Sequence, residues 1–162
     1  MTAEQYAHLT APFRGGRAQL VPMTDRAVTT LGFAAYPAIL FFLRWKTGAL
    51  PWREIAVPAA SLVLVSLLRA LLDRPRPYER LAITPLIAKS TRGRSFPSRH
   101  VFSVFIIAAT GFTVAPWVGA AMTAAGVLLM ATRVLGGVHD LWDVLAGAAL
   151  GLLLGAAGYM TL

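Results

Sequence analysis

Two histidines and a carboxylate have the types and spacing that nucleophilic chemistry needs. His139 and Asp143 are four residues apart, so on a helix they lie one turn apart on the same face. A carboxylate in that position can hold the Nδ1–H of the imidazole and leave Nε2 unprotonated for attack. His100 could then act as the general acid that protonates the leaving oxygen. These three residues are the candidate catalytic groups.

Basic residues near these histidines indicate what would be attacked. Eight of the fifteen Lys and Arg residues lie between 69 and 99, and this stretch carries +6 of the formal net charge of +8. Arginine binds phosphate through paired, charge-assisted hydrogen bonds. Ser98 opens a helix whose free N–H groups also favour an anion. The predicted phosphate ligands are Arg69, Arg76, Ser98, Arg99 and Arg133.

Three explanations of the basic stretch compete at this point. It is a positive-inside loop, a surface attracted to anionic headgroups, or a phosphate site. Topology favours the phosphate site, because the two spans after the loop form a hairpin that returns the chain to the same membrane face near His139. A metal held by His139, Asp143 and His100 is disfavoured because the arginines would repel a cation. We therefore expect no metal and no cofactor.

The composition predicts the scaffold that must position these groups. The chain of 162 residues is 57% hydrophobic and 14% charged, with mean hydropathy +0.64, which is typical of a membrane protein and argues against nucleic-acid binding. The absence of Cys excludes disulfides and thiolate sites. A charge-free run of 32 residues from 101 to 132 would extend ~48 Å as one helix, so it must turn, and Pro116 marks the turn. We predict one all-α domain over 1–162, a polytopic membrane helical bundle with spans at about 27–44, 55–72, 99–115, 117–134 and 139–160.

The segments outside the spans are assigned as follows. Residues 1–26 form a polar amino-terminal segment, and residues 73–98 form the basic active-site loop. Tyr6, Leu9, Phe13 and Leu20 allow an interfacial helix in the first segment, with a frayed tail as the alternative. Small residues at Gly147, Gly151 and Gly155 favour close helix contact, either within the bundle or in a homodimer through that face.

Three motifs in this arrangement resemble the type 2 phosphatidic acid phosphatase family, which shares its active site with vanadium haloperoxidases. The family motifs are K-x6-R-P, P-S-G-H and S-R-x5-H-x3-D. Here they appear, with spacing and order kept, as Arg69-x6-Arg76-Pro77, Pro97-Ser98-Arg99-His100 and Thr132-Arg133-x5-His139-x3-Asp143.

The resemblance implies a metal-independent phosphatase that works through a phosphohistidine. It makes His139 the nucleophile, Asp143 its orienting partner and His100 the acid, with the phosphate held by Arg69, Arg76, Ser98 and Arg133. The implied substrate is a membrane lipid phosphate or diphosphate, such as a prenyl (for example undecaprenyl) diphosphate, phosphatidic acid or phosphatidylglycerophosphate. The implied location is the cell membrane, with the site on the extracytoplasmic face. A non-enzymatic lipid-binding or transport protein and a vanadate-dependent peroxidase relative remain the alternatives.

Three residues of this sequence differ from the family motifs, and one of them leads to a prediction about specificity. Arg69 replaces Lys and Thr132 replaces Ser, which keeps the charge and the hydroxyl. Arg99 replaces a Gly, and we expect its side chain to reach the substrate headgroup and bias specificity. Five spans with the site outside place the amino terminus outside and the carboxyl terminus inside.

Overall fold

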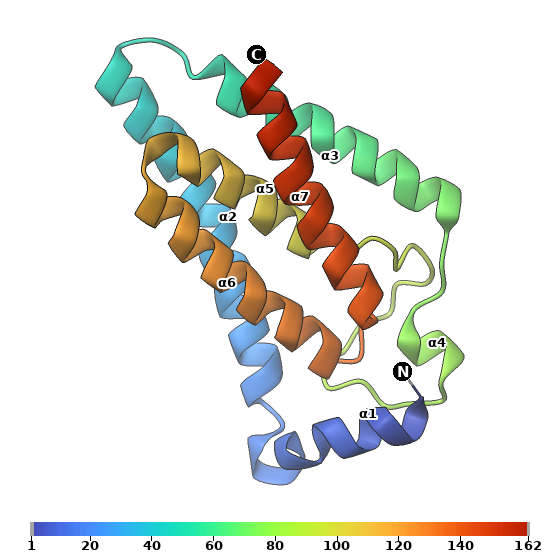
Figure 1. The fold of residues 1–162 in the computed structure, drawn as a ribbon. Helices are drawn as coiled ribbons and strands as arrows, with labels where there is room; N and C mark the ends of the chain where they lie inside the picture. Colours follow the sequence, from blue (N-terminus) through green and yellow to red (C-terminus); the bar gives the residue numbers. More distant parts are fainter. Residues whose placement is uncertain (1, 162) are drawn as a thin grey trace.

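The computed structural model describes residues 2–161, and within them all regular structure is helical (Figure 1). Two 3₁₀ turns, Ala11–Phe13 and Gly15–Arg17, connect the first two helices. The α-helices are α1 (Ala3–Thr10), α2 (Leu20–Thr47), α3 (Trp52–Leu72), α4 (Pro77–Arg80), α5 (Arg99–Val114), α6 (Pro116–Leu135) and α7 (Leu141–Thr161). The five long helices confirm the five predicted spans.

The largest boundary difference lies at the start of the first span. α2 begins at Leu20, seven residues before the predicted start at 27, because Asp25 is buried inside the bundle instead of marking a polar end. Four helices, α2, α3, α6 and α7, are long and apolar enough to cross a membrane. Their outer faces carry exposed large apolar side chains such as Leu31, Phe41 and Leu71, as expected of surfaces that meet lipid. The protein is a multi-pass membrane protein.

The central helix α5 is the shortest of the five long helices and is surrounded by the other four. Its residues from Val101 to Gly111 are almost all buried, and it packs against α2, α3, α6 and α7. It ends at Val114, and the extended backbone of Ala115 leads into Pro116 at the first position of α6, so the predicted turn forms. α5 therefore presents its amino-terminal residues, which include His100, from the middle of the bundle.

A glycine stripe brings α7 against α5. A Cβ added at Gly147 would lie 2.6 Å from the carbonyl oxygen of Ser98, and one at Gly151 would lie 2.8 Å from that of Phe102. Gly155 meets Ala109 in the same way, at 2.4 Å. The contact is thus within the bundle, and α5 occupies the face that the sequence also offered for a homodimer.

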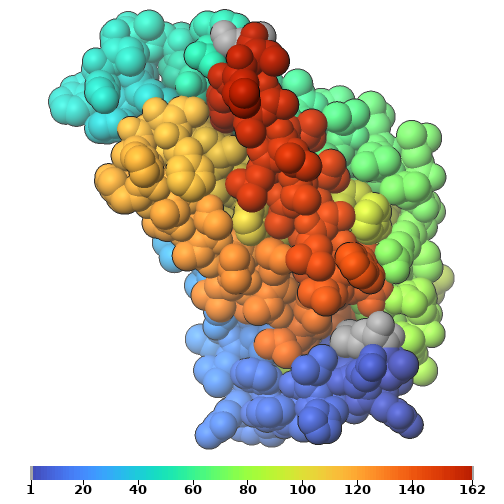
Figure 2. Space-filling model, viewed as in Figure 1, coloured from blue at the N-terminus to red at the C-terminus, as the bar shows by residue number. Residues whose placement is uncertain are grey.

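The two ends of the bundle differ in what they carry. α1, α4, the loop 73–98 and the turn between α6 and α7 gather at one end, while the carboxyl terminus and the α2–α3 turn lie at the other (Figure 1). In the space-filling view α1 closes the first end beneath α6 and α7 (Figure 2). The Tyr6 hydroxyl donates to the carbonyl of Leu135 and accepts from the N–H of Leu86, both at 3.2 Å. The amino-terminal segment is therefore a docked helix and not a frayed tail.

Candidate active site

The three motifs meet around one cavity of about 520 Å³ at the α1 end of the bundle. Its lining includes five of the eight predicted site residues, namely Arg69, Arg76, Arg99, His100 and His139. The other three, Ser98, Arg133 and Asp143, are buried beside the lining residues. All eight predicted residues are therefore gathered in one place.

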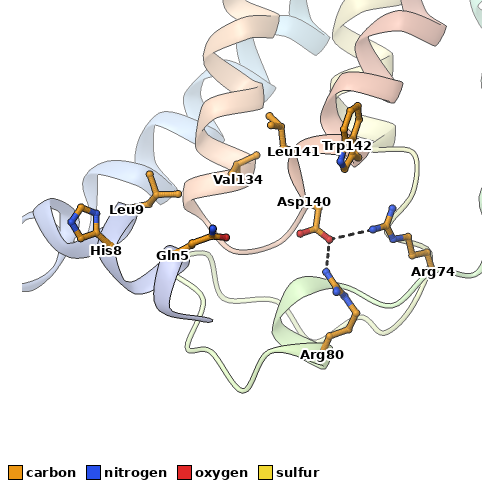
Figure 3. A pocket seen from close by; sticks show the side chains of 9 residues that line it. All are labelled: Gln5, His8, Leu9, Arg74, Arg80, Val134, Asp140, Leu141 and Trp142. Carbon is orange, nitrogen blue, oxygen red and sulfur yellow. Dashed lines mark hydrogen bonds and ion pairs between the residues drawn. The ribbon is translucent and has the colours of Figure 1, made fainter. Parts of the chain in front are cut away.

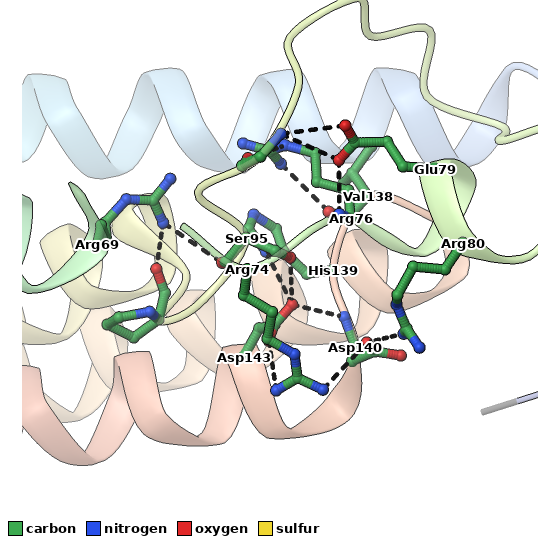
Figure 4. A network of polar contacts seen from close by, with 12 residues as sticks. Arg69, Arg74, Arg76, Glu79, Arg80, Ser95, Val138, His139, Asp140 and Asp143 are labelled. Atoms are coloured by element: carbon green, nitrogen blue, oxygen red, sulfur yellow. Dashed lines mark hydrogen bonds and ion pairs between the residues drawn. The ribbon is translucent and has the colours of Figure 1, made fainter. Parts of the chain in front are cut away.

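Asp143 lies next to His139, as their spacing predicts. The Oδ2 atom of Asp143 is 3.5 Å from Nδ1 of His139. The same oxygen accepts hydrogen bonds from the Ser95 hydroxyl and from the backbone N–H of Asp140, the latter at 3.0 Å (Figure 4). The Ser95 hydroxyl is itself 3.4 Å from Nδ1 of His139. With Nδ1 facing these oxygens, Nε2 is the nitrogen left for chemistry.

His139 does not sit on the helix that was predicted to begin with it. α7 starts at Leu141, and His139 lies in the turn that follows α6. Gly137 permits this turn, because its φ of 73° lies in the left-handed region and a Cβ there would meet the Tyr6 hydroxyl at 2.8 Å. The turn brings the imidazole back toward the first turn of α7. The predicted contact with Asp143 therefore forms although His139 lies outside the helix.

Burial sets the protonation state of His139. Burial, together with the positive charges of Arg76 and Arg133, lowers the pKa of the imidazole to about 4, although the hydrogen bond to Asp143 acts to raise it. The ring is therefore neutral near pH 7. A neutral imidazole with its Nδ1 held is the form that can attack through Nε2.

The arginines of the first motif tie the other two motifs together. Arg69 donates from Nη1 to the carbonyls of Ser95, at 3.4 Å, and Pro97. Arg76 donates from Nη1 to the carbonyl of Val138 at 3.2 Å, next to His139 in the chain (Figure 4). Both guanidinium groups are buried, so their remaining N–H groups are oriented by the protein before any ligand binds.

Two acids of the loop hold its backbone. The Glu79 carboxylate accepts from the N–H of Gly93 at 3.0 and 3.1 Å and from that of Arg76 at 2.6 Å. Asp73 accepts from the N–H of Arg94 at 3.2 Å. These carboxylates thus bind backbone donors of the loop.

A second carboxylate network adjoins the site. Asp140 lies 2.5 Å from Nη2 of Arg80 and 3.7 Å from that of Arg74 (Figure 3). Arg74 also approaches Oδ1 of Asp143 at 3.5 Å (Figure 4). These groups border a cavity of about 750 Å³ whose other walls include Leu9 and Trp142. Although this cavity is larger, neither motif histidine lines it, so the smaller cavity is the candidate active site.

Sequence reasoning missed two polar residues of the site. Ser95 lies three residues before the second motif, and nothing in its spacing marks it as a partner of Asp143. Asp25 is buried in α2 and lies 2.9 Å from Nε of Arg133. The sequence does contain an indication of this residue, because an acid within one turn of an apolar span is costly to bury unless a cation or hydrogen-bond donor pairs with it.

No group of three or more His, Asp or Glu side chains within residues 2–161 is arranged to hold a metal ion. His139 and Asp143 contact each other and Ser95, and arginines surround them. The donor set is therefore suited to an anion.

Comparison with known proteins agrees with this geometry. A sequence model of the PAP2 superfamily matches residues 51–162. No curated protein sequence matches the chain. Among solved structures, LpxE from Aquifex aeolicus aligns with a TM-score of 0.75 at 22% identity, covering 98% of this chain and 94% of that one. A PAP2-type phosphatidylglycerolphosphate phosphatase from Bacillus subtilis aligns with a TM-score of 0.66 at 22% identity, covering 96% and 90%. At these identities the two structures establish a shared fold.

Proposed function

Because the chain belongs to the PAP2 superfamily, we propose that it is a membrane phosphatase that hydrolyses a lipid phosphate or diphosphate through a phosphohistidine on His139. The observation that carries the proposal is the meeting of all three motifs at one cavity, with a neutral His139 held by Asp143 among buried arginines. Phosphoryl transfer needs this combination, because the phosphoryl oxygens require positive donors and the phosphorus requires an in-line nucleophile.

The first step transfers the phosphoryl group to the protein. Nε2 of His139 attacks phosphorus, the bond from phosphorus to the lipid oxygen breaks, and protonated His100 gives its proton to that oxygen. The negative charge of the bound phosphate favours the protonated form of His100. Asp143 stabilises the positive charge that develops on the His139 ring.

The second step restores the protein. Neutral His100 now accepts a proton from water, the water oxygen attacks phosphorus, and the N–P bond breaks to release inorganic phosphate. Arg69, Arg76 and Arg133 stabilise the equatorial oxygens in both steps. No metal and no cofactor takes part in this mechanism.

A lipid substrate is favoured by the position of the cavity. It lies at one end of helices whose outer faces are apolar, so an anionic headgroup can enter it while the tails stay in the bilayer. We place this end on the extracytoplasmic face of the cell membrane, with the carboxyl terminus inside. Arg44, Lys46 and Arg53 at the opposite end then follow the positive-inside rule.

The test of the proposed function is phosphate release by the purified protein in detergent. The substrates are phosphatidic acid, phosphatidylglycerophosphate and a prenyl diphosphate, each assayed with a chelator and without added divalent metal. We expect release from at least one of them in the presence of the chelator. Activity that the chelator abolishes would overturn the metal-independent phosphohistidine mechanism.

The test of the topology is a reporter fused to each terminus. We expect the amino-terminal reporter to be active only outside the cytoplasm and the carboxyl-terminal reporter only inside. Both termini on the cytoplasmic side would contradict the five-span arrangement.

A further inference from the structure

Asp25 is a buried acid on the one long helix that lies wholly outside the matched segment. α2 spans Leu20–Thr47, whereas the PAP2 match begins at residue 51. The Asp25 side chain is only 7% exposed, so its carboxylate is largely removed from solvent. A buried carboxylate is stable only when cations or hydrogen-bond donors compensate its charge, so its partners indicate its role.

Those partners belong to the third motif. Oδ1 of Asp25 lies 2.9 Å from Nε of Arg133 and accepts a hydrogen bond from the Thr132 hydroxyl at 3.1 Å. Thr29, one helical turn further along α2, accepts from Nη2 of Arg133 at 3.2 Å. α2 therefore holds two of the three guanidinium nitrogens of Arg133. The third, Nη1, has no hydrogen bond or ion pair to residues 2–161 of the chain.

The same face of α2 also approaches His100. Phe33 lies one turn beyond Thr29, and the centroid of its ring is 6.0 Å from the centroid of the His100 ring. Asp25, Thr29 and Phe33 are spaced four residues apart, so they lie along one side of the helix. α2 thus lies against two residues of the candidate site, Arg133 and His100, and is not only a packing helix.

The negative charge of Asp25 also offsets positive charge near the site. The charges of Arg133 and Arg76 both lower the pKa values of Lys89 and His139, so these four groups lie close enough to interact. Buried cations this close together repel one another unless an anion lies among them. Before a phosphate binds, Asp25 is the carboxylate paired with Arg133.

We propose that Asp25, with Thr29, is a positioning residue that fixes the guanidinium of Arg133 so that its free nitrogen is directed at the phosphoryl group. This inference rests on the proposed function, in which Arg133 binds phosphate. It adds a requirement that the three motifs do not contain, namely an acid and a hydroxyl supplied by the preceding helix.

The first experiment compares Asp25→Asn and Thr29→Val with Thr30→Val, a change on the exposed side of the same helix. Initial rates are measured on the lipid phosphate that the wild type hydrolyses best, together with inhibition by orthovanadate, a mimic of the in-line transition state. We expect Asp25→Asn to lower kcat about 10- to 100-fold, to change KM less than threefold and to weaken vanadate inhibition in parallel. Thr29→Val has a smaller effect in the same direction, and Thr30→Val has none.

The second experiment separates positioning from general support of the fold. Asp25→Asn is combined with Arg133→Ala, and unfolding midpoints in detergent are recorded for all variants. If Asp25 acts through Arg133, the double variant is no less active than Arg133→Ala alone, and it is more stable because no unpaired carboxylate remains. A further multiplicative loss of kcat in the double variant would overturn the proposal.

The outcomes also distinguish this inference from the proposed function. Loss of activity in Arg133→Ala with full activity in both Asp25→Asn and Thr29→Val overturns only the positioning role. Full activity in Arg133→Ala overturns both the phosphate-binding role of Arg133 and the inference built on it. If Asp25→Asn does not fold, Thr29→Val decides alone, because it removes one hydrogen bond to Arg133 and leaves the ion pair with Asp25 in place.

Discussion

The two sides of the candidate active-site cavity use positive charge in different ways. The inner wall, which comprises Arg69, Arg76 and His139 with Arg133 beside them, is buried. Every one of these side chains contacts a carbonyl or a carboxylate of the protein. The rim, formed by Lys89, Arg92, Arg94 and Arg99, is half-buried or exposed. Within the described part of the chain its side chains make no hydrogen bond or ion pair.

This difference indicates two roles. Groups that are already oriented before the substrate binds need no reorganisation as the transition state forms. The inner wall is therefore suited to bind the transferred phosphoryl group. Solvated cations on flexible side chains attract anions over a distance and adapt to their shape, so the rim is suited to capture and to the rest of the headgroup. Changes in the inner wall should lower kcat, and changes in the rim should alter KM and substrate preference.

The largest effect is expected from His139→Ala. Removal of the proposed nucleophile should lower kcat by about 10⁴-fold or more, because the remaining arginines can bind the phosphate but cannot accept it. Phosphate release and lipid binding are measured on the same preparation. Lipid binding should persist, and unchanged phosphate release would refute His139 as the nucleophile. Lipid binding without phosphate release by the wild type would instead favour a lipid-binding or transport protein.

A comparison of Asp143→Asn with Asp140→Asn tests the inner wall next. Asp143 contacts Nδ1 of His139, whereas Asp140 pairs with Arg80 and Arg74. We expect Asp143→Asn to lower kcat about 10²- to 10⁴-fold, since an amide does not hold the required tautomer. Asp140→Asn should cost less than tenfold. Equal losses in the two variants would mean that the carboxylates act only by holding the local structure.

Arg99→Gly tests the rim. It restores the residue that the family motif has at this position and removes an exposed cation that lines the cavity. We expect kcat on the best substrate to change less than threefold, and the ranking of lipid phosphates by kcat/KM to change by about 3- to 10-fold. An unaltered ranking would contradict a role for Arg99 in specificity.

The smallest effect is a pH dependence that comes from Lys89. Burial, together with the charges of Arg76 and Arg133, lowers the pKa of this amine to about 8. The ammonium form therefore prevails below pH 8 and the neutral amine above it, so KM for an anionic substrate should rise two- to fivefold between pH 7.5 and 9.5. A phosphomonoester is already fully ionised over this range.

Lys89→Arg is the matched control for that profile, because arginine keeps its charge throughout. The rise in KM should be absent in this variant. A rise of the same size in both proteins would assign the pH dependence to another group.

Much of the site could be predicted from the sequence because it depends on local spacing. The distance of four residues between His139 and Asp143 survived even though His139 lies in a turn before α7. The motif containing Arg76 and the one containing His100 lie close enough in sequence that one loop joins them. The spans followed from charge-free runs, since a bilayer tolerates few charges.

The contacts that the sequence does not predict join residues that lie far apart in the chain. Asp25 and Arg133 are 108 positions apart in the chain, and the polar residues near 25 were interpreted as the end of a span. Ser95 joins Asp143 across 48 positions through a loop without regular structure. Only the packing of α2 against α6, and of the loop against α7, creates these contacts, and no local spacing encodes them.

The sequence by itself determined a helical membrane protein with the three family motifs at one end, because hydropathy and motif spacing are local properties of the chain. The tertiary structure decided which cations are fixed and which remain free, because a side chain is immobilised by the neighbours that folding brings to it. It also decided the use of the glycine stripe on α7, which α5 covers. Arg133 and Arg99 have the same side chain, and only the surroundings of each, a buried carboxylate or open solvent, separate an inner-wall group from a rim group.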